Sequence, residues 1–411
     1  MLRSWRAVVA RLRALLRSDT AAVRAGFVAL LISSGGDLLA GLVLGSITGT
    51  LDELPGLLVL VPAAIGMRGN VFGALGSRLG TAIHTGTFRL SRRRDTVVGQ
   101  NLAAALAMSL GISLVLAILA KSVAVAFGVQ NTISVADFVV ISVIGGFLSS
   151  IVVMAITVGV ATLSVRRAWD LDNVSAPIVT AAGDMVTLPA LFLATYLVGF
   201  ALVTPIIAVL CAVVAIGALV VSLRSRAPIL RRIARESLPV LVIAGAVDVI
   251  AGLTIEKQFE SFLVYPALLV LVPSFLEDSG ALGGIMSARI ATKLHLGTLE
   301  PGRGSLRSVG EDILLIVLYA VPVFFFLGVS ADIVSWAVGL TSPGILEMIA
   351  VAMLAGALAT TFAVMIGFYG AVAAYRLGLD PDNHGIPIVT SSLDLLGAFA
   401  LILAIVALGL T

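Results

Sequence analysis

The chain has almost none of the side chains that build disulfide frameworks or transition-metal sites. Its 411 residues include one cysteine and three histidines. The lone Cys211 excludes an intrachain disulfide and any cysteine-based metal cluster, and its apolar neighbours indicate a small buried hydrophobic residue. The enzyme motifs HExxH and GxSxG are also missing. We therefore expect a protein that is not an enzyme.

Charged side chains are scarce as well. Only 12% of the residues are charged, whereas 59% are hydrophobic, and both values are far from those of soluble globular proteins. The formal net charge of +3 is small, so the sequence carries no electrostatic footprint of a nucleic-acid partner. The composition indicates a protein that is surrounded by membrane lipid.

Long apolar runs dominate what remains. A helix that spans a bilayer needs about 20 apolar residues, and the sequence contains eleven such runs. These runs cover residues 24–50, 54–83, 96–127, 135–164, 175–199, 203–223, 237–256, 261–294, 310–339, 345–376 and 386–410. They predict an all-α integral membrane protein. The runs at 54–83 and 261–294 are long and rich in glycine, so we expect discontinuous helices there.

The basic residues predict the orientation in the membrane. Residues 1–23 read as a cytosolic amphipathic helix with arginines beside an apolar face, either at the membrane interface or on a partner's surface. The clusters RLSRRR, RSRAPILRRIAR and TKLHLGTLEPGRGSLR then fall on the cytosolic side. An odd number of spans places Thr411 outside. We expect a multi-pass protein of the plasma membrane.

An internal repeat organises these spans. The segment LVLVPAAIGMRGNVFGALGSRLGTAIHTG matches LVLVPSFLEDSGALGGIMSARIATKLHLG at an offset of 211 residues. The paired positions are Pro62 with Pro273, Asp37 with Asp248 and, at an offset of 210, Asp184 with Asp394. Each half is therefore one unit of five helices.

One extra span between the two copies explains how a five-helix unit can be repeated in the same orientation. We predict a first repeat over 24–200, a linker helix with a basic loop over 201–235, and a second repeat over 236–411. The linker returns the chain to the side on which the first copy began, so the copies are parallel and a pseudo-twofold axis lies along the membrane normal. One chain holds both halves, and we expect a monomer to be sufficient.

Two repeated aspartates are the strongest candidates for an ion site. Asp184 stands in APIVTAAGDMVTLPA and Asp394 in IPIVTSSLDLLGAFA, each seven residues after a proline that is expected to start a helix. Each carboxylate then lies about 10 Å inside the membrane. Thr180 and Thr390 come one helical turn earlier on the same side. Such hard oxygen ligands suit Mg²⁺, whereas softer metals prefer thiolates and imidazoles. The alternative is that each aspartate pairs with an arginine.

Other intramembrane polar residues leave alternatives open. Asp37 and Asp248 predict either a second ion site or a hydrogen bond between helices. Asn70 belongs to RGN in the first copy, where the second copy reads SGA. Glu277 and Asp278 have no acidic counterpart in the first copy. They either make the path asymmetric or pair with Arg68.

The stretch VPAAIGMRGNVFGALGSRL and the later PIVTxxxD resemble the MgtE family of magnesium transporters, and the two-copy arrangement resembles its solute carrier family 41 branch. The resemblance implies a five-helix transmembrane unit in which the aspartate of the fifth helix, here Asp184 or Asp394, binds Mg²⁺ as the transported substrate. Only about 24 residues precede the first run, so gating by CBS domains is not expected. A secondary carrier for Ca²⁺, Mn²⁺ or an organic anion, coupled to Na⁺ or H⁺, remains the alternative.

Overall fold

The computed structural model describes residues 20–91, 93, 95–167, 171–300, 306–378 and 385–410. Most of the amphipathic helix predicted over residues 1–23 therefore lies outside the described residues. The regular structure of the described residues is helical. The elements are α2 Thr20–Ser46, α3 Thr48–Glu53, α4 Leu57–His84, α5 Val97–Ala126, α6 Val135–Arg167, α7 Leu171–Thr195, α8 Val203–Leu223, α9 Pro228–Glu256, α10 Phe259–Val264, α11 Ala267–His295, the 3₁₀ turn η1 Leu306–Val309, α12 Gly310–Ala337, α13 Ile345–Arg376 and α14 Ile386–Ala407.

Eleven of these helices are long and apolar enough to cross a membrane. The prediction of an all-α integral membrane protein is thus confirmed. The two remaining helices, α3 and α10, have six residues each and stand immediately before α4 and α11.

The prediction of discontinuous helices was wrong. Helix α4 runs unbroken from Leu57 to His84, and α11 runs unbroken from Ala267 to His295. Their internal glycines serve close packing: a Cβ built on Gly69 would lie 3.5 Å from the Thr180 methyl group, and one built on Gly280 would lie 3.5 Å from Thr390 Cβ. Small residues that let helices approach each other do not have to break the helix.

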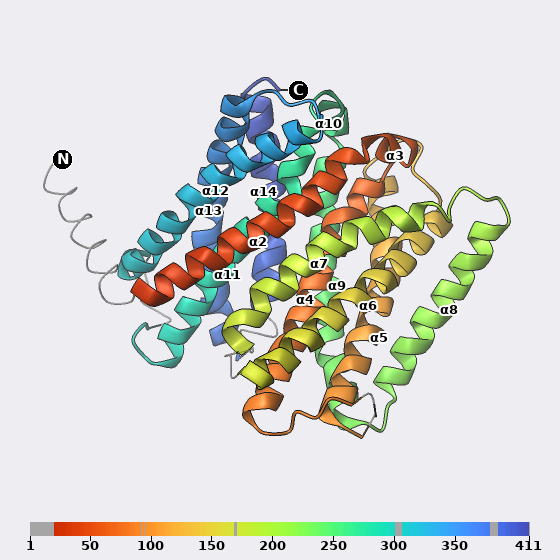
Figure 1. The fold of residues 1–411 in the computed structure, drawn as a ribbon, viewed down its shortest axis with the longest axis vertical. Helices are drawn as coiled ribbons and strands as arrows, with labels where there is room; N and C mark the ends of the chain where they lie inside the picture. Colours follow the sequence, from red (N-terminus) through yellow and green to blue (C-terminus); the bar gives the residue numbers. More distant parts are fainter. Residues whose placement is uncertain are drawn as a thin grey trace, which may run out of the picture.

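The first helix of each five-helix half packs against the other half (Figure 1). Helix α2 lies on α11, and α9 lies on α4. Repeat-related glycines permit both contacts. A Cβ on Gly41 would lie 2.1 Å from the Val270 carbonyl oxygen, and one on Gly252 would lie 2.4 Å from the Val59 carbonyl oxygen. The backbones therefore touch at both positions, and the two halves interlock.

Helix α8, which the sequence predicts as the linker between the repeats, lies at the edge of the bundle against α5 and α6. Only 17% of its membrane-spanning window is buried, compared with 72% for α4 and 78% for α11. The innermost helices are therefore α4 and α11, and the linker takes little part in the core.

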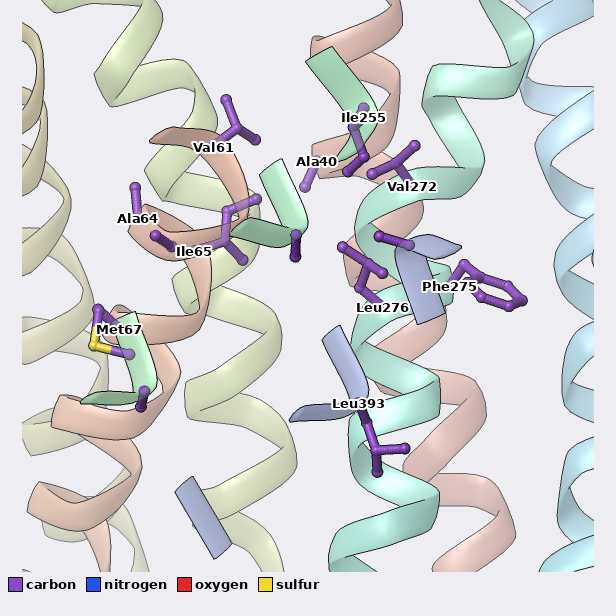
Figure 2. Close-up of a cluster of buried hydrophobic side chains, with 14 of the residues drawn as sticks. Ala40, Val61, Ala64, Ile65, Met67, Ile255, Val272, Phe275, Leu276 and Leu393 are labelled. Carbon is purple, nitrogen blue, oxygen red and sulfur yellow. The ribbon is translucent and has the colours of Figure 1, made fainter. Parts of the chain in front are cut away.

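Apolar side chains of α4 and α11 face each other at the centre of the bundle. Figure 2 shows Val61 and Ile65 on α4, with Val272 and Leu276 on α11. Leu393 of α14 joins the same buried cluster. The four side chains of α4 and α11 also line a small cavity, together with acidic side chains.

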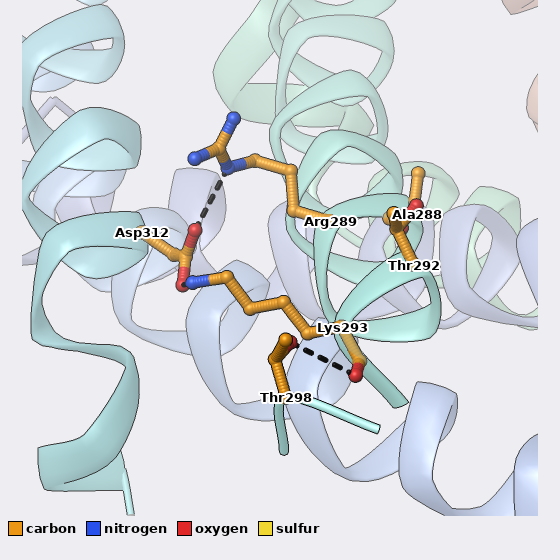
Figure 3. Close-up of polar contacts among 6 residues, drawn as sticks. All are labelled: Ala288, Arg289, Thr292, Lys293, Thr298 and Asp312. Carbon is orange, nitrogen blue, oxygen red and sulfur yellow. Dashed lines mark hydrogen bonds and ion pairs between the residues drawn. The ribbon is translucent and has the colours of Figure 1, made fainter. Parts of the chain in front are cut away.

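A cluster of charged side chains joins the end of α11 to the start of α12 in the second repeat (Figure 3). In the second half, the fully buried Asp312 accepts a hydrogen bond of 2.8 Å from Arg289 Nε and forms an ion pair with Lys293. The repeat-related position in the first half is Asn101. Its side-chain nitrogen donates to the Val97 carbonyl oxygen of its own helix. The second half is thus tied together at this end by charges that the first half lacks.

Candidate functional site

Four helices place aspartates in the interior of the bundle. Asp37 lies on α2, Asp184 on α7, Asp248 on α9 and Asp394 on α14. The first three are at most 1% exposed, and Asp394 is partly buried. Four acidic residues inside membrane-spanning segments are costly to retain and indicate an ion pathway.

The aspartates form two repeat-related pairs. The carboxyl groups of Asp37 and Asp184 are close neighbours, and so are those of Asp248 and Asp394. Asp184 is a more distant neighbour of Asp394 than Asp248 is. The sequence led us to expect Asp184 and Asp394 to face each other, whereas the nearest carboxyl partner of each is the aspartate on the first helix of its own repeat.

Close helix contacts explain this pairing. A Cβ on Gly36, next to Asp37, would lie 2.9 Å from the Ala181 Cβ atom, so α2 and α7 approach closely one turn before Asp184. At the other pair, a Cβ on Gly66 of α4 would lie 3.2 Å from Asp248 Oδ2 and 3.7 Å from Asp394 Oδ2. The missing side chain of Gly66 leaves space for both carboxyl groups.

No hydrogen-bond donor of the described chain satisfies these carboxylates. Both oxygens of Asp37, Asp184 and Asp248 are buried without a hydrogen-bond partner. The Ser391 hydroxyl lies beside Asp248 but completes no hydrogen bond with it. Two adjacent carboxylates in a low dielectric repel each other strongly and need a cation or a proton to neutralise them. The arrangement is therefore suited to binding cations.

A fifth carboxylate, that of Glu277, lies in the electrostatic field of all four aspartates. Together with Asp394 it lines a small cavity whose other walls are Val61, Pro62, Ile65, Gly66, Val272, Pro273 and Leu276. The space open to the centre of a water molecule is about 20 Å³, room for about one water. The sequence shows that this carboxylate is specific to the second repeat, because Gly66 stands at the corresponding position of the first.

Arg68 does not neutralise these acidic residues. Its Nε donates to Ser149 Oγ at 3.1 Å and its Nη2 donates to Ser113 Oγ at 2.8 Å. Asp278 instead accepts hydrogen bonds of 2.8 and 2.9 Å from the Ser34 hydroxyl. Of the two alternatives for Glu277 and Asp278, pairing with Arg68 is therefore not found, because the guanidinium group extends away from α11 toward α5 and α6.

The predicted threonines flank the aspartates on the helices that carry them. Thr180 packs its methyl group toward Gly69, and Thr390 packs toward Gly280. The Thr390 hydroxyl donates to the Pro387 carbonyl oxygen at 3.1 Å. Asn70 is partly buried and follows Gly69 on α4.

The prolines before the aspartates differ in role. Pro387 stands in the first turn of α14, as predicted. Helix α7, however, already begins at Leu171, so Pro177 lies within it and the prediction that it starts the helix was wrong. One proline removes only one hydrogen-bond donor, and a helix can continue through it at some energetic cost.

Comparison with known proteins identifies the family. The family model described as MgtE, divalent cation transporter, matches residues 61–194 and 272–404, two segments that start 211 residues apart. Rat solute carrier family 41 member 3 is 25% identical over 414 residues, covering 92% of this chain and 85% of the relative. Solute carrier family 41 member 2 is 27% identical in Xenopus laevis (90% and 69% covered) and 25% identical in human (92% and 69% covered). No solved structure matches the chain significantly.

The matched segments contain both fifth-helix aspartates, Asp184 and Asp394, and Glu277. They cover more than half of the 411 residues. Transport rather than catalysis is the activity of this family. The chain therefore belongs to the MgtE family of divalent cation transporters.

Proposed function

We propose that the protein transports Mg²⁺ and that the ion passes between the two repeats, held partly hydrated by Asp184 and Asp394. The observation that carries the proposal is the pair of carboxylate contacts inside the membrane. Asp37 lies beside Asp184, and Asp248 lies beside Asp394. No hydrogen-bond donor among the described residues satisfies the buried carboxylate oxygens. A divalent cation supplies the positive charge that this arrangement requires.

The ligand chemistry favours Mg²⁺ among divalent cations. Mg²⁺ keeps several of its waters and is commonly bound by one or two carboxylates, whereas Ca²⁺ takes six to eight oxygen ligands. Among the described residues, no group of three or more His, Cys, Asp or Glu side chains is arranged to hold a metal ion directly. Two carboxylates and retained water suit a hydrated ion better than a dehydrated one. Thiolates and imidazoles, which softer metals prefer, do not contribute to the two pairs.

Mg²⁺ flux into proteoliposomes tests this proposal. We expect the wild-type protein to admit Mg²⁺ and to retain this flux when Ca²⁺ is present in equal amount. Asp184→Asn should lose most of it, whereas Asp137→Asn, which removes an equal charge at the start of α6, should not. Equal flux in wild type and Asp184→Asn would contradict the site. Faster flux of Ca²⁺ or Mn²⁺ than of Mg²⁺ would contradict the choice of ion.

The proposed orientation places the N-terminus in the cytosol of a cell bounded by the plasma membrane. The basic loop between α4 and α5 and the loop between α11 and α12 are then cytosolic, in agreement with the positive-inside rule. With Cys211 replaced, a cysteine at Glu300 should react with an impermeant reagent only from the cytosol, and one at Gln130 only from outside. Both positions are exposed. Labelling of both from one side would contradict this topology.

We further propose that a single chain is sufficient, because it carries both aspartate pairs. Purified protein should elute as a monomer of 42.3 kDa in light-scattering chromatography and should bind Mg²⁺ in that form. A monomer fraction that bound no Mg²⁺, beside a dimer that did, would contradict this part.

A further inference from the structure

A groove opens on the first repeat, and none of the four paired aspartates lines it. It has a volume of about 700 Å³ and lies along α6, between α5 and the loop that joins α4 to α5. Its walls include Leu90 of the loop, Leu102 of α5 and Met154 and Val158 of α6. Among the described residues, the polar side chains that line it are those of Ser91, Thr162 and Arg166.

Two small residues of α6 create this groove. A Cβ built on Gly159 would have no atom within 4 Å, so the space beside it is open. Ala155 lies one turn earlier on the same face. At the offset of 210 residues, which also relates Arg166 to Arg376, the second repeat has Met365 and Tyr369 at these two positions. The second repeat therefore carries larger side chains at the two positions that are small in the first.

The groove has an apolar body and a positively charged end. The Thr162 hydroxyl donates to the Val158 carbonyl oxygen at 2.8 Å, so it leaves no unsatisfied donor for an occupant. Arg166, at the end of the groove, is exposed and forms no hydrogen bond or ion pair with the described part of the chain. Arg89 and Arg93, in the neighbouring loop, are exposed at the same end of the bundle.

The length of the groove agrees with the thickness of one bilayer leaflet. From Ile151 to Arg166 the lining of α6 rises by 15 residue steps, or about 22 Å. Half of the hydrocarbon core plus its polar interface measures about 20 Å. An occupant with a single-leaflet acyl chain would therefore place its headgroup near Arg166.

We propose that this groove binds a phospholipid with an anionic headgroup, whose acyl chain lies along Ala155 and Gly159 and whose phosphate contacts Arg166. Attraction between the anionic headgroup and the arginine end of the groove provides the selectivity. Apolar contact of the acyl chain provides the remaining affinity. Because α6 packs against α7, which carries Asp184, a bound lipid would contact a helix that supports the ion site.

The test uses the full-length protein, stripped of lipid in detergent, and native mass spectrometry. We expect phosphatidylglycerol to bind more tightly than phosphatidylcholine with the same acyl chains. Gly159→Tyr, which reproduces the residue of the second repeat, should abolish tight binding of both lipids. Arg166→Gln should lower phosphatidylglycerol affinity about tenfold, the value of one hydrogen bond to a charged group. It should lower phosphatidylcholine affinity less, because the choline cation already offsets the phosphate charge of that headgroup. The control Arg231→Gln removes an exposed arginine of α9 and should change neither.

Location is checked independently with a phosphatidylglycerol that carries a photoreactive acyl chain. Cross-links should map to residues 151–166 and disappear in Gly159→Tyr, with folding of the variant verified by size exclusion. Equal binding of the two lipids by wild type, or unchanged phosphatidylglycerol binding by both variants, would overturn the proposal. So would a concentration-dependent dimer that Gly159→Tyr disrupts, because the groove would then hold a second copy of the chain.

Discussion

Gly252 of α9 presses against the backbone of Val59 on α4, in the same way that Gly41 of α2 meets Val270 on α11. The contact joins a helix of the second repeat to one of the first. It leaves no space for a side chain, because even a Cβ would lie 2.4 Å from a carbonyl oxygen.

Gly252→Val should therefore weaken the interlock of the two repeats. Overpacking of a buried site costs about 1–3 kcal/mol, and more where the backbone itself must move. The thermal midpoint in detergent, followed by fluorescence-detected size exclusion, should fall. Gly217→Val on the peripheral α8, where a Cβ meets no atom within 4 Å, is the matched control. An equal midpoint for both variants would contradict the interlock.

The charge cluster at the end of α11 provides a second prediction. Asp312→Asn removes the buried carboxylate that Arg289 and Lys293 share, and it should lower the free energy of unfolding by about 1–3 kcal/mol. Both cations remain partly exposed, at 40% and 33%, so water limits the loss. Glu236→Gln, which breaks the exposed pair with Arg232, should cost less than about 1 kcal/mol. Urea unfolding monitored by circular dichroism measures the unfolding free energy of both variants. An equal loss in both would mean that the Asp312 ion pairs contribute no more than an exposed surface pair.

Much of this fold could be predicted from the sequence, because a bilayer demands long apolar helices and the offset of 211 residues relates the halves. The partner of Asp184 could not. The apolar runs do not show which helices contact the other half, whereas in the structure the backbone contacts at Gly41 and Gly252 bring α2 onto α11 and α9 onto α4. Glu277 was equally hard to place, because its importance depends on the space left by Gly66 on another helix.

The apolar side chains that face each other on α4 and α11 predict a constriction. Leu276 lines the small cavity beside Glu277 and is 5% exposed. Leu276→Ala should lower the free energy of unfolding by about 2–5 kcal/mol and raise Mg²⁺ flux in proteoliposomes, because narrow apolar passages exclude water and ions. Leu282→Ala removes an equally buried leucine of α11 outside the cavity. It should lower stability without raising flux, and a similar rise in both variants would assign the effect to loosened packing.

Glu277 should strengthen Mg²⁺ binding through its charge. Glu277→Gln removes one of five acidic groups. Two unit charges separated by roughly 8–16 Å interact by about 1–2 kcal/mol at an effective dielectric constant of about 20. Calorimetry should then show an affinity lower by roughly five- to thirtyfold. Asp278→Asn removes the next charge along α11, which is hydrogen-bonded to Ser34, and should mainly lower the thermal midpoint. If Asp278→Asn weakened Mg²⁺ binding more than Glu277→Gln did, the assignment of roles would be reversed.

The two fifth-helix aspartates, Asp184 and Asp394, should bind one ion together. Asp184→Asn or Asp394→Asn alone should weaken Mg²⁺ binding about tenfold or more, since a ligand to a charged group contributes about 1.5–3 kcal/mol. If both carboxylates hold the same hydrated ion, the double variant should lose little beyond the worse single variant, because groups that share one partner are strongly non-additive. Calorimetric affinities of the four proteins, with folding checked by size exclusion, complete the cycle. Additive losses would mean two independent sites, one at the Asp37 and Asp184 pair and one at the Asp248 and Asp394 pair. The repeat symmetry of the two pairs would then describe separate binding steps along the path instead of one shared site.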